Sequence, residues 1–135
     1  TYTGHPVSCA VALKTLEIYE RDKVFQHAEK VGKYFQNSMK DILKEDYVGE
    51  VRGIGLIAGI ELYKDPSNKI PFEEAGKAGK ILSDTCQKNG LIVRPILDTI
   101  ALCPPLIISE KEVDELTDKL KKSLQEAKDE IMKIH

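Results

Sequence analysis

The spacing of apolar residues predicts two helices in the first third of the chain. His5-Pro6 opens the first, because proline is tolerated at the first helical position. From Val7 to about Tyr19 the apolar face is broad, which predicts a largely buried helix. Asp22 is the expected N-cap of a second helix, whose apolar residues recur at steps of three and four: Val24, Ala28, Val31, Phe35, Met39 and Ile42. We expect this pair to form one helical layer.

Two more helices are expected in the second half of the chain. Residues 72–88 are predicted to be helical and to stop at Asn89-Gly90, a natural C-terminal cap. Ser109, with Glu112 three residues later, is a capping box for the last helix. The apolar stripe of that helix runs to the C-terminus: Val113, Leu116, Leu120, Leu124, Ala127, Ile131 and Ile134.

Between the helices, four short apolar or β-branched segments predict strands: 47–52, 56–63, 91–93 and 99–102. Gly53-Ile54-Gly55 indicates a tight bend between the first two, residues 64–71 a loop, and residues 95–98 a turn between the last two. Pro104-Pro105 prevents the last strand from continuing. The order of elements predicts a single α/β (α+β) domain of two layers with a short, mostly antiparallel sheet.

Length and charge narrow the class of protein. The chain has 135 residues, enough for one modest core. Its formal net charge is -2, with both signs interspersed, so nucleic acid is not an expected partner. Its apolar runs are too short to span a membrane, and no signal-peptide pattern opens the chain. We expect a protein of the cytoplasm or of an organelle matrix.

Cysteines and histidines give no sign of a metal site or disulfide framework. The cysteines lie far apart without paired spacing and are expected to be small buried hydrophobes: Cys9, Cys86 and Cys103. The histidines form no ligand cluster: His5, His27 and His135. No metal is therefore expected.

The glycines of residues 52–59 resemble a dinucleotide-binding fingerprint. That fingerprint requires a preceding strand and a helix that opens inside the motif, whereas a strand is predicted to follow here. The favoured interpretation is a hairpin bend with close backbone packing.

The first six residues, Thr1-Tyr2-Thr3-Gly4-His5-Pro6, place hydroxyls and free backbone donors just ahead of a helix. The positive end of a helix with such donors suits an anion, so a phosphate is one candidate ligand. A simple N-cap turn is the alternative that the pattern alone favours.

Arg94 ends an apolar segment and is followed by Pro95. The planar guanidinium suits a carboxylate, which makes Arg94 a candidate substrate clamp. A structural ion pair with Asp98 or Glu61 is an equal alternative. The lysines lie mostly on polar helix faces, and none is a candidate catalytic residue.

Four segments resemble, in this order, the C-terminal third of class III (omega-amino-acid) aminotransferases, which depend on pyridoxal 5'-phosphate: residues 1–6, 51–62, 90–95 and 103–108. The resemblance covers nearly the whole chain. It implies the C-terminal small domain of a fold type I transferase. The large domain, with its Schiff-base lysine, would precede Thr1, which is not a methionine. This fragment would then hold no catalytic residue and be inactive alone.

The same resemblance implies roles for particular residues. Thr1 would bind the phosphate of the neighbouring subunit's pyridoxal phosphate in a homodimer, with Tyr2 and Thr3 as weaker contacts. Arg94 would receive the substrate's α-carboxylate and swing aside for substrates that lack one. One departure is notable: relatives often carry glycine before the aspartate of this segment, whereas Ile96-Leu97 precede Asp98 here. The bulkier turn would narrow the pocket or pack against the large domain.

The implied reaction is transfer of an amino group from an amine or omega-amino acid to a keto acid. A related aminomutase and a noncatalytic dimerising or regulatory remnant are the alternatives. A fragment would expose apolar surface, so we also expect self-association through the first helix.

Overall fold

The structure is a computed structural model that describes residues 3–134. Thr1 and Tyr2, two of the expected cofactor contacts, lie outside the described residues, as does His135. Four α-helices, a short 3₁₀ helix and four strands follow one another in this order: α1 (Pro6–Arg21), α2 (Val24–Lys40), η1 (Asp41–Lys44), β1 (Val48–Ile54), β2 (Ile57–Leu62), α3 (Lys77–Lys88), β3 (Arg94–Ile96), β4 (Thr99–Leu102) and α4 (Glu110–Ile131).

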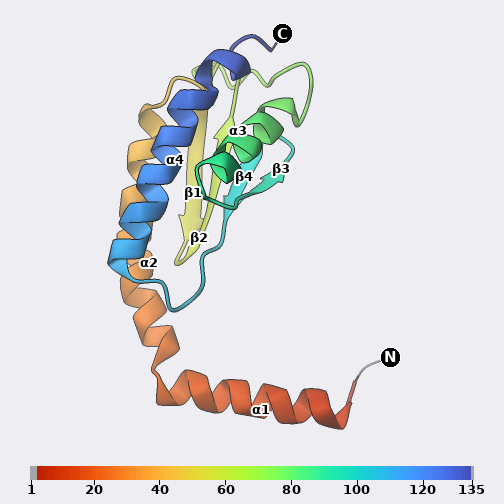
Figure 1. Ribbon diagram of the computed structural model, residues 1–135, viewed down its shortest axis with the longest axis vertical. Helices are drawn as coiled ribbons and strands as arrows, with labels where there is room; N and C mark the ends of the chain where they lie inside the picture. Colours follow the sequence, from red (N-terminus) through yellow and green to blue (C-terminus); the bar gives the residue numbers. More distant parts are fainter. Residues whose placement is uncertain (1–2, 135) are drawn as a thin grey trace.

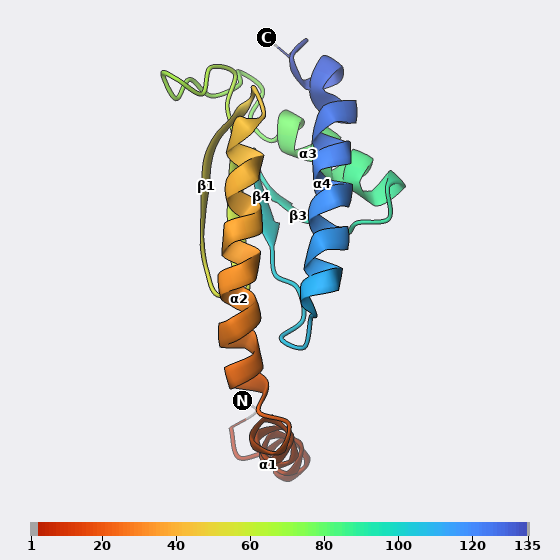
Figure 2. The ribbon, with the colours of Figure 1, turned by 90° about the vertical axis from the view of Figure 1, so that its left-hand side faces the viewer.

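The four strands form one antiparallel sheet in the order β1-β2-β4-β3. Helices α2, α3 and α4 lie on one side of this sheet, as Figures 1 and 2 show. The predicted two-layer α/β architecture and the antiparallel sheet are confirmed. Between the layers, the core draws on α2, α3, α4 and the inward-facing strand residues, among which Phe35, Ile60, Leu82, Ile100 and Leu120 are fully buried.

Helix α1 contradicts the expectation of burial. None of its described residues is buried, and Val7, Val11, Leu13 and Leu16 are each more than half exposed. Figure 1 shows the reason: α1 runs away from the body of the domain at the lower end of α2. The apolar pattern was interpreted correctly as a helix, but no element of the described chain covers it.

The junction between α1 and α2 also differs from the prediction. Asp22 does not cap α2; its carboxylate accepts hydrogen bonds from Arg21, and Lys23 with φ 51° is the N-cap residue. The bend at these residues prevents α1 and α2 from packing side by side as one layer. Within α2 the predicted core positions Val31 and Phe35 are buried.

The glycine-rich segment joins β1 and β2 as a hairpin, which confirms that a strand follows it. Strand β1 continues to Ile54, two residues beyond the predicted end. A Cβ on Gly53 would lie 2.2 Å from the carbonyl oxygen of Ile57, so the backbones approach too closely for a side chain.

Helix α3 begins at Lys77, five residues after the predicted start. Gly76, with φ 85°, is the N-cap and interrupts any helix that would include Phe72. At the other end the predicted cap holds, since Gly90 has φ 75° and the Leu91 N–H donates to the carbonyl oxygen of Cys86.

The third strand was misplaced. Residues 91–93 are not a strand; pairing begins at Arg94, and the turn comprises Leu97 and Asp98 rather than residues 95–98. Proline is tolerated within β3 because this strand lies at the edge of the sheet and pairs on one side. The backbone that leaves α3 must first cross to the sheet, which uses residues 91–93.

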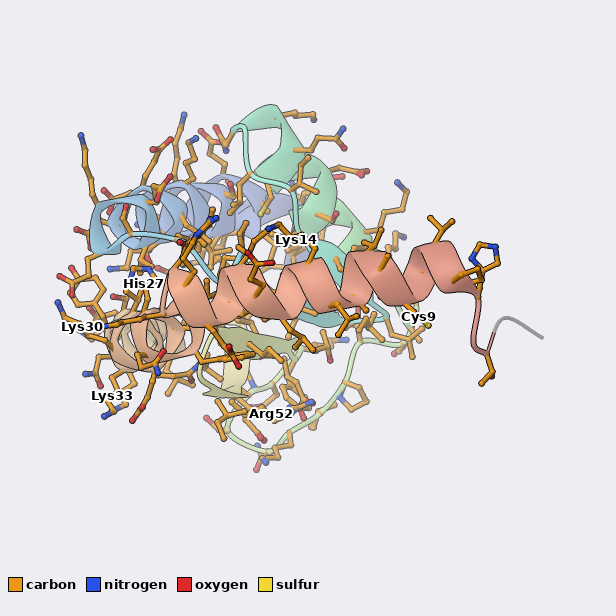
Figure 3. The ribbon with its side chains drawn as sticks, turned by 90° about the horizontal axis from the view of Figure 1, so that it is seen from below. Cys9, Lys14, His27, Lys30, Lys33 and Arg52 are labelled. Carbon is orange, nitrogen blue, oxygen red and sulfur yellow. The ribbon has the colours of Figure 1, made fainter. Side chains whose placement is uncertain are left out.

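Of the three cysteines expected to be buried, Cys86 is buried, while Cys9 and Cys103 are exposed. Burial raises the pKa of the Cys86 thiol. Cys9 lies on α1, which crosses in front of the rest of the domain when the molecule is seen from below (Figure 3). Its exposure has the same cause as that of the α1 apolar residues.

Helix α4 matches the prediction. The Ser109 hydroxyl accepts from the Glu112 N–H, and the Glu112 carboxylate accepts from the Ser109 N–H at 2.8 Å. At its centre, the buried Tyr47 hydroxyl donates to the carbonyl oxygen of Leu124 at 2.6 Å. This bond ties α4 to the segment that leads into β1.

Candidate functional site

Arg94 lies on the face of the sheet that the helices leave open. Directly paired residues of an antiparallel sheet point to the same face. Arg94 pairs with Ala101, Ala101 pairs with Gly59, and Gly59 pairs with Arg52. The two arginines therefore stand on the same face, in a row separated by two small residues, while neighbouring positions such as Ile100 are buried on the helix-covered face.

The two guanidinium groups of this row differ in their partners. Arg52 forms ion pairs with Glu61 and Glu50. The Tyr63 hydroxyl, which donates to Glu61, and then the Arg52 guanidinium hold the pKa of that carboxyl below its ordinary value. This cluster escaped the sequence analysis, although the alternation of residues along β1 and β2 is the signal that places Arg52 and Glu61 on one face.

Arg94 is exposed and forms no ion pair within the described residues 3–134. Both structural partners considered from the sequence are engaged elsewhere: Glu61 with Arg52 and Tyr63, and Asp98 with backbone N–H groups. Arg94 therefore forms neither of the two ion pairs that the sequence suggested. Next to it, a shallow depression on the open face is lined by residues of β1, β2, β4 and β3, including Arg52, Gly59, Ile96 and Ala101.

The hairpin that carries Arg94 is fastened to the start of α3. The Asp98 carboxylate accepts from the Gly76 N–H at 2.8 Å and from the Gly79 N–H at 3.0 Å. Gly76 has no side chain to cap the helix, so Asp98 caps it from the turn. The Asp98 carbonyl oxygen also accepts from the Leu62 N–H of β2 at 2.9 Å. Asp98 thus joins the turn to both α3 and the sheet.

The sequence departure at Leu97 falls at a backbone position that favours glycine. Its φ of 52° lies in the left-handed region, where glycine is the favoured residue in a two-residue hairpin loop. Its side chain is 68% exposed. Within the described residues the turn contacts α3, where a Cβ on Gly79 would lie 2.0 Å from the Leu97 carbonyl oxygen.

The N-terminus of α1 is open to solvent. The Ser8 N–H points to His5 Nδ1 at 3.4 Å, and the Cys9 N–H donates to the His5 carbonyl oxygen. The first turn holds no acidic residue, and Thr3 and Gly4 ahead of it are exposed. A turn with His5 as N-cap is therefore present, and the positive helix end remains accessible. The structure does not bring the start of α1 and strand β3 together, because α1 lies apart from the sheet (Figure 1).

A family model described as "Aminotransferase class-III" matches residues 1–124. The chain belongs to the class III aminotransferase family. No helix among residues 3–134 is long and apolar enough to cross a membrane.

Relatives of this class III aminotransferase chain are themselves aminotransferases. It is 37% identical over 134 residues to a probable gamma-aminobutyrate transaminase 3, mitochondrial, of Oryza sativa subsp. indica, covering 99% of this chain and 26% of the relative. It is 39% identical over 127 residues to an adenosylmethionine-8-amino-7-oxononanoate aminotransferase of Methanocaldococcus jannaschii, covering 94% of this chain and 28% of the relative. The chain thus spans about a quarter of the length of these relatives.

Solved structures agree with this assignment. A structure described as a transaminase with L-Ala matches 97% of this chain and 30% of its own, with 38% identity and a TM-score of 0.91. The omega transaminase of Pseudomonas jessenii in complex with PMP matches 95% of this chain and 28% of its own, with 35% identity and a TM-score of 0.89. The α/β small-domain fold is therefore that of class III transaminases.

Proposed function

We propose that this chain is the C-terminal small domain of a pyridoxal-phosphate-dependent transaminase that moves an amino group from an amine or omega-amino acid to a keto acid. The family match and the share of the relatives' length that the chain covers support this proposal. The observation that carries the site is the exposed guanidinium of Arg94, on the open face of the sheet and outside the ion pairs that occupy Arg52.

Arg94 is the proposed substrate-carboxylate contact. An arginine without a protein partner can form a bidentate, charge-assisted pair with a carboxylate. Since Arg94 is exposed on an edge strand, its side chain can also turn aside when a substrate lacks the carboxylate. The neighbouring Arg52 is a poorer candidate, because Glu61 and Glu50 already neutralise it.

Thr1 is the proposed contact to the cofactor phosphate of a neighbouring subunit, with Tyr2 and Thr3 as weaker contacts. The open start of α1 fits this role, since it presents a positive helix end with no acidic residue in its first turn. Pyridoxal phosphate, when bound, supplies the electron sink for amino-group transfer. The proposed role of this chain is orientation. Its N-terminal residues would hold the phosphate of the neighbouring subunit's cofactor, and Arg94 would hold the substrate carboxylate.

The proposal is tested with the longer protein that carries this chain, purified with pyridoxal phosphate. Loss of the bound cofactor's absorbance is followed on adding L-alanine, which has a carboxylate, or propylamine, which has none. Arg94→Ala should raise the half-saturating concentration of L-alanine roughly 10- to 100-fold, as expected for a lost hydrogen bond between charged groups, and leave that of propylamine unchanged.

Arg52→Ala is the matched control, because it removes the same charge from the same face of the sheet. It should not separate the two amines. For the phosphate contact, Thr1→Ala should weaken binding of the cofactor to the apoprotein more than Thr3→Ala. A protein that binds the cofactor and does not react with amines would refute transamination, and one that binds no cofactor would favour a noncatalytic dimerising module.

A further inference from the structure

The turn that follows Arg94 is held by hydrogen bonds beyond those that pair β3 with β4. Strand β3 has three residues and pairs with one neighbour, so few sheet contacts fix its direction. The additional restraint comes from Asp98, whose two carboxylate oxygens hold two N–H groups at the start of α3 and whose carbonyl oxygen holds β2. Three separate elements therefore meet at this one residue.

We propose that Asp98 is a positioning residue for Arg94: by fastening the β3–β4 hairpin to the N-terminus of α3, it fixes the backbone from which the Arg94 guanidinium reaches the substrate. This inference rests on the proposed role of Arg94. It assigns to Asp98 no contact with the substrate, since both of its carboxylate oxygens already accept backbone N–H groups.

The close approach of the turn to α3 supports this assignment independently of the hydrogen bonds. The Leu97 carbonyl oxygen lies where a Cβ on Gly79 would stand, at 2.0 Å. Leu97 also keeps a left-handed φ of 52°, an unfavourable conformation for a leucine that persists when surrounding contacts impose it. The β3–β4 turn therefore lies in close backbone contact with α3, and the Asp98 hydrogen bonds hold it there.

A fixed backbone and a free side chain suit the proposed role of Arg94. Its guanidinium would bind substrates that have a carboxylate and turn aside for those that lack one. The Arg94 guanidinium can change rotamer without moving the turn, because the restraints act on Leu97 and Asp98 and on no atom of the Arg94 side chain. A displaced turn would move the starting point of the guanidinium, and small errors of position at a reacting site are costly.

The test compares Asp98→Asn with Arg94→Ala and with the double variant, in the longer protein with its cofactor. Asparagine keeps one acceptor oxygen, so the fold should be retained while one of the two bonds to α3 is lost. We expect about a 10-fold rise in the half-saturating concentration of L-alanine and no change for propylamine. In the Arg94→Ala background, Asp98→Asn should have no further effect, because the two residues act through one contact.

Two further variants keep the test decisive. Asp84→Asn removes a carboxylate from the exposed side of the same helix, where it pairs with Lys80, and should change neither substrate. Gly79→Ala displaces the turn from the helix side and should reproduce the Asp98→Asn effect. If Asp98→Asn affects both amines equally, or adds its full effect to Arg94→Ala, its role is structural and the inference is wrong. If Arg94→Ala itself fails to separate the amines, the proposed function fails first.

Discussion

Replacing Tyr47 with phenylalanine isolates one buried hydrogen bond between α4 and the segment before β1. The Tyr47 side chain is fully buried, and its hydroxyl donates to the Leu124 carbonyl oxygen at 2.6 Å. Phenylalanine keeps the ring and its packing and removes the donor alone. The change therefore tests the hydrogen bond and not the core.

The expected cost follows from what the substitution leaves behind. The Leu124 carbonyl lies within a helix and retains its backbone partner, so no polar group is left without a partner. The loss should then be that of one net hydrogen bond, about 1 kcal/mol in the free energy of unfolding. Tyr47→Ala, by contrast, also removes the ring and should cost about 3–5 kcal/mol. Urea denaturation of both variants provides the measurement.

The dependence on pH gives a second, independent test. Burial, followed by the nearby Glu45, raises the pKa of Tyr47 above its ordinary value of 10.0. Deprotonation of the Tyr47 hydroxyl is therefore less favourable in the folded state than in the unfolded state. The contribution of this hydroxyl to stability is complete below its unfolded pKa and is lost as the pH rises above that value. Above about pH 10 the wild type should lose stability relative to Tyr47→Phe.

Tyr34→Phe is the control, because it removes the same atom from a surface position. The Tyr34 hydroxyl donates to the Asp114 carboxylate at 2.6 Å, but Tyr34 is 36% exposed and water can replace the bond. Its cost should be within about 0.5 kcal/mol. Equal losses for Tyr34→Phe and Tyr47→Phe would refute the reasoning from burial.

Three further predictions concern packing, a helix cap and an exposed surface. Gly79→Ala should destabilise the domain by about 1–3 kcal/mol, since a Cβ there would meet a turn carbonyl oxygen at 2.0 Å, whereas Gly59→Ala, with its nearest atom at 3.7 Å, should be tolerated in thermal unfolding. The Ser109 hydroxyl holds the pKa of Glu112 below its ordinary value. The cap therefore stabilises the fold at a pH above that ordinary value, and this contribution is lost as the pH falls. Ser109→Ala should make the free energy of unfolding depend less on pH in the acid range. Leu16→Glu, on the exposed apolar face of α1, should reduce self-association in light scattering, and a wild type that stays monomeric would contradict this.

The periodic part of the sequence predicted the structure well, because its signals are local. The α4 stripe and its Ser109–Glu112 box are confirmed, as are the core positions Val31 and Phe35 of α2. Side chains that recur on one helix face indicate burial wherever the rest of the chain provides a covering layer. Helix α1 shows the limit, since its pattern identified the helix and could not reveal that residues 3–134 contain nothing to cover it.

The errors near the candidate site have a common cause in tertiary contacts. Helix α3 starts at Lys77 because Asp98 caps it from a distant turn, and β3 starts at Arg94 because the chain must first cross from α3 to the sheet. Neither contact leaves a signal in the local sequence. The sequence identified Arg94 as a clamp or an ion-pair partner; that Glu61 and Asp98 bind other groups could be known only from their positions in the fold.

Helix α1 divides the chain into two parts of different cooperativity. Its backbone hydrogen bonds are protected by no buried side chain, and an isolated helix of this length is marginal in water. In the chain alone, amide hydrogens of α1 should exchange through local helix–coil opening, while those of α4 should exchange through global unfolding. A partner surface that covers α1 would slow exchange of the α1 amides and leave that of the α4 amides unchanged. The exchange rate of α1 therefore measures whether such a surface is bound.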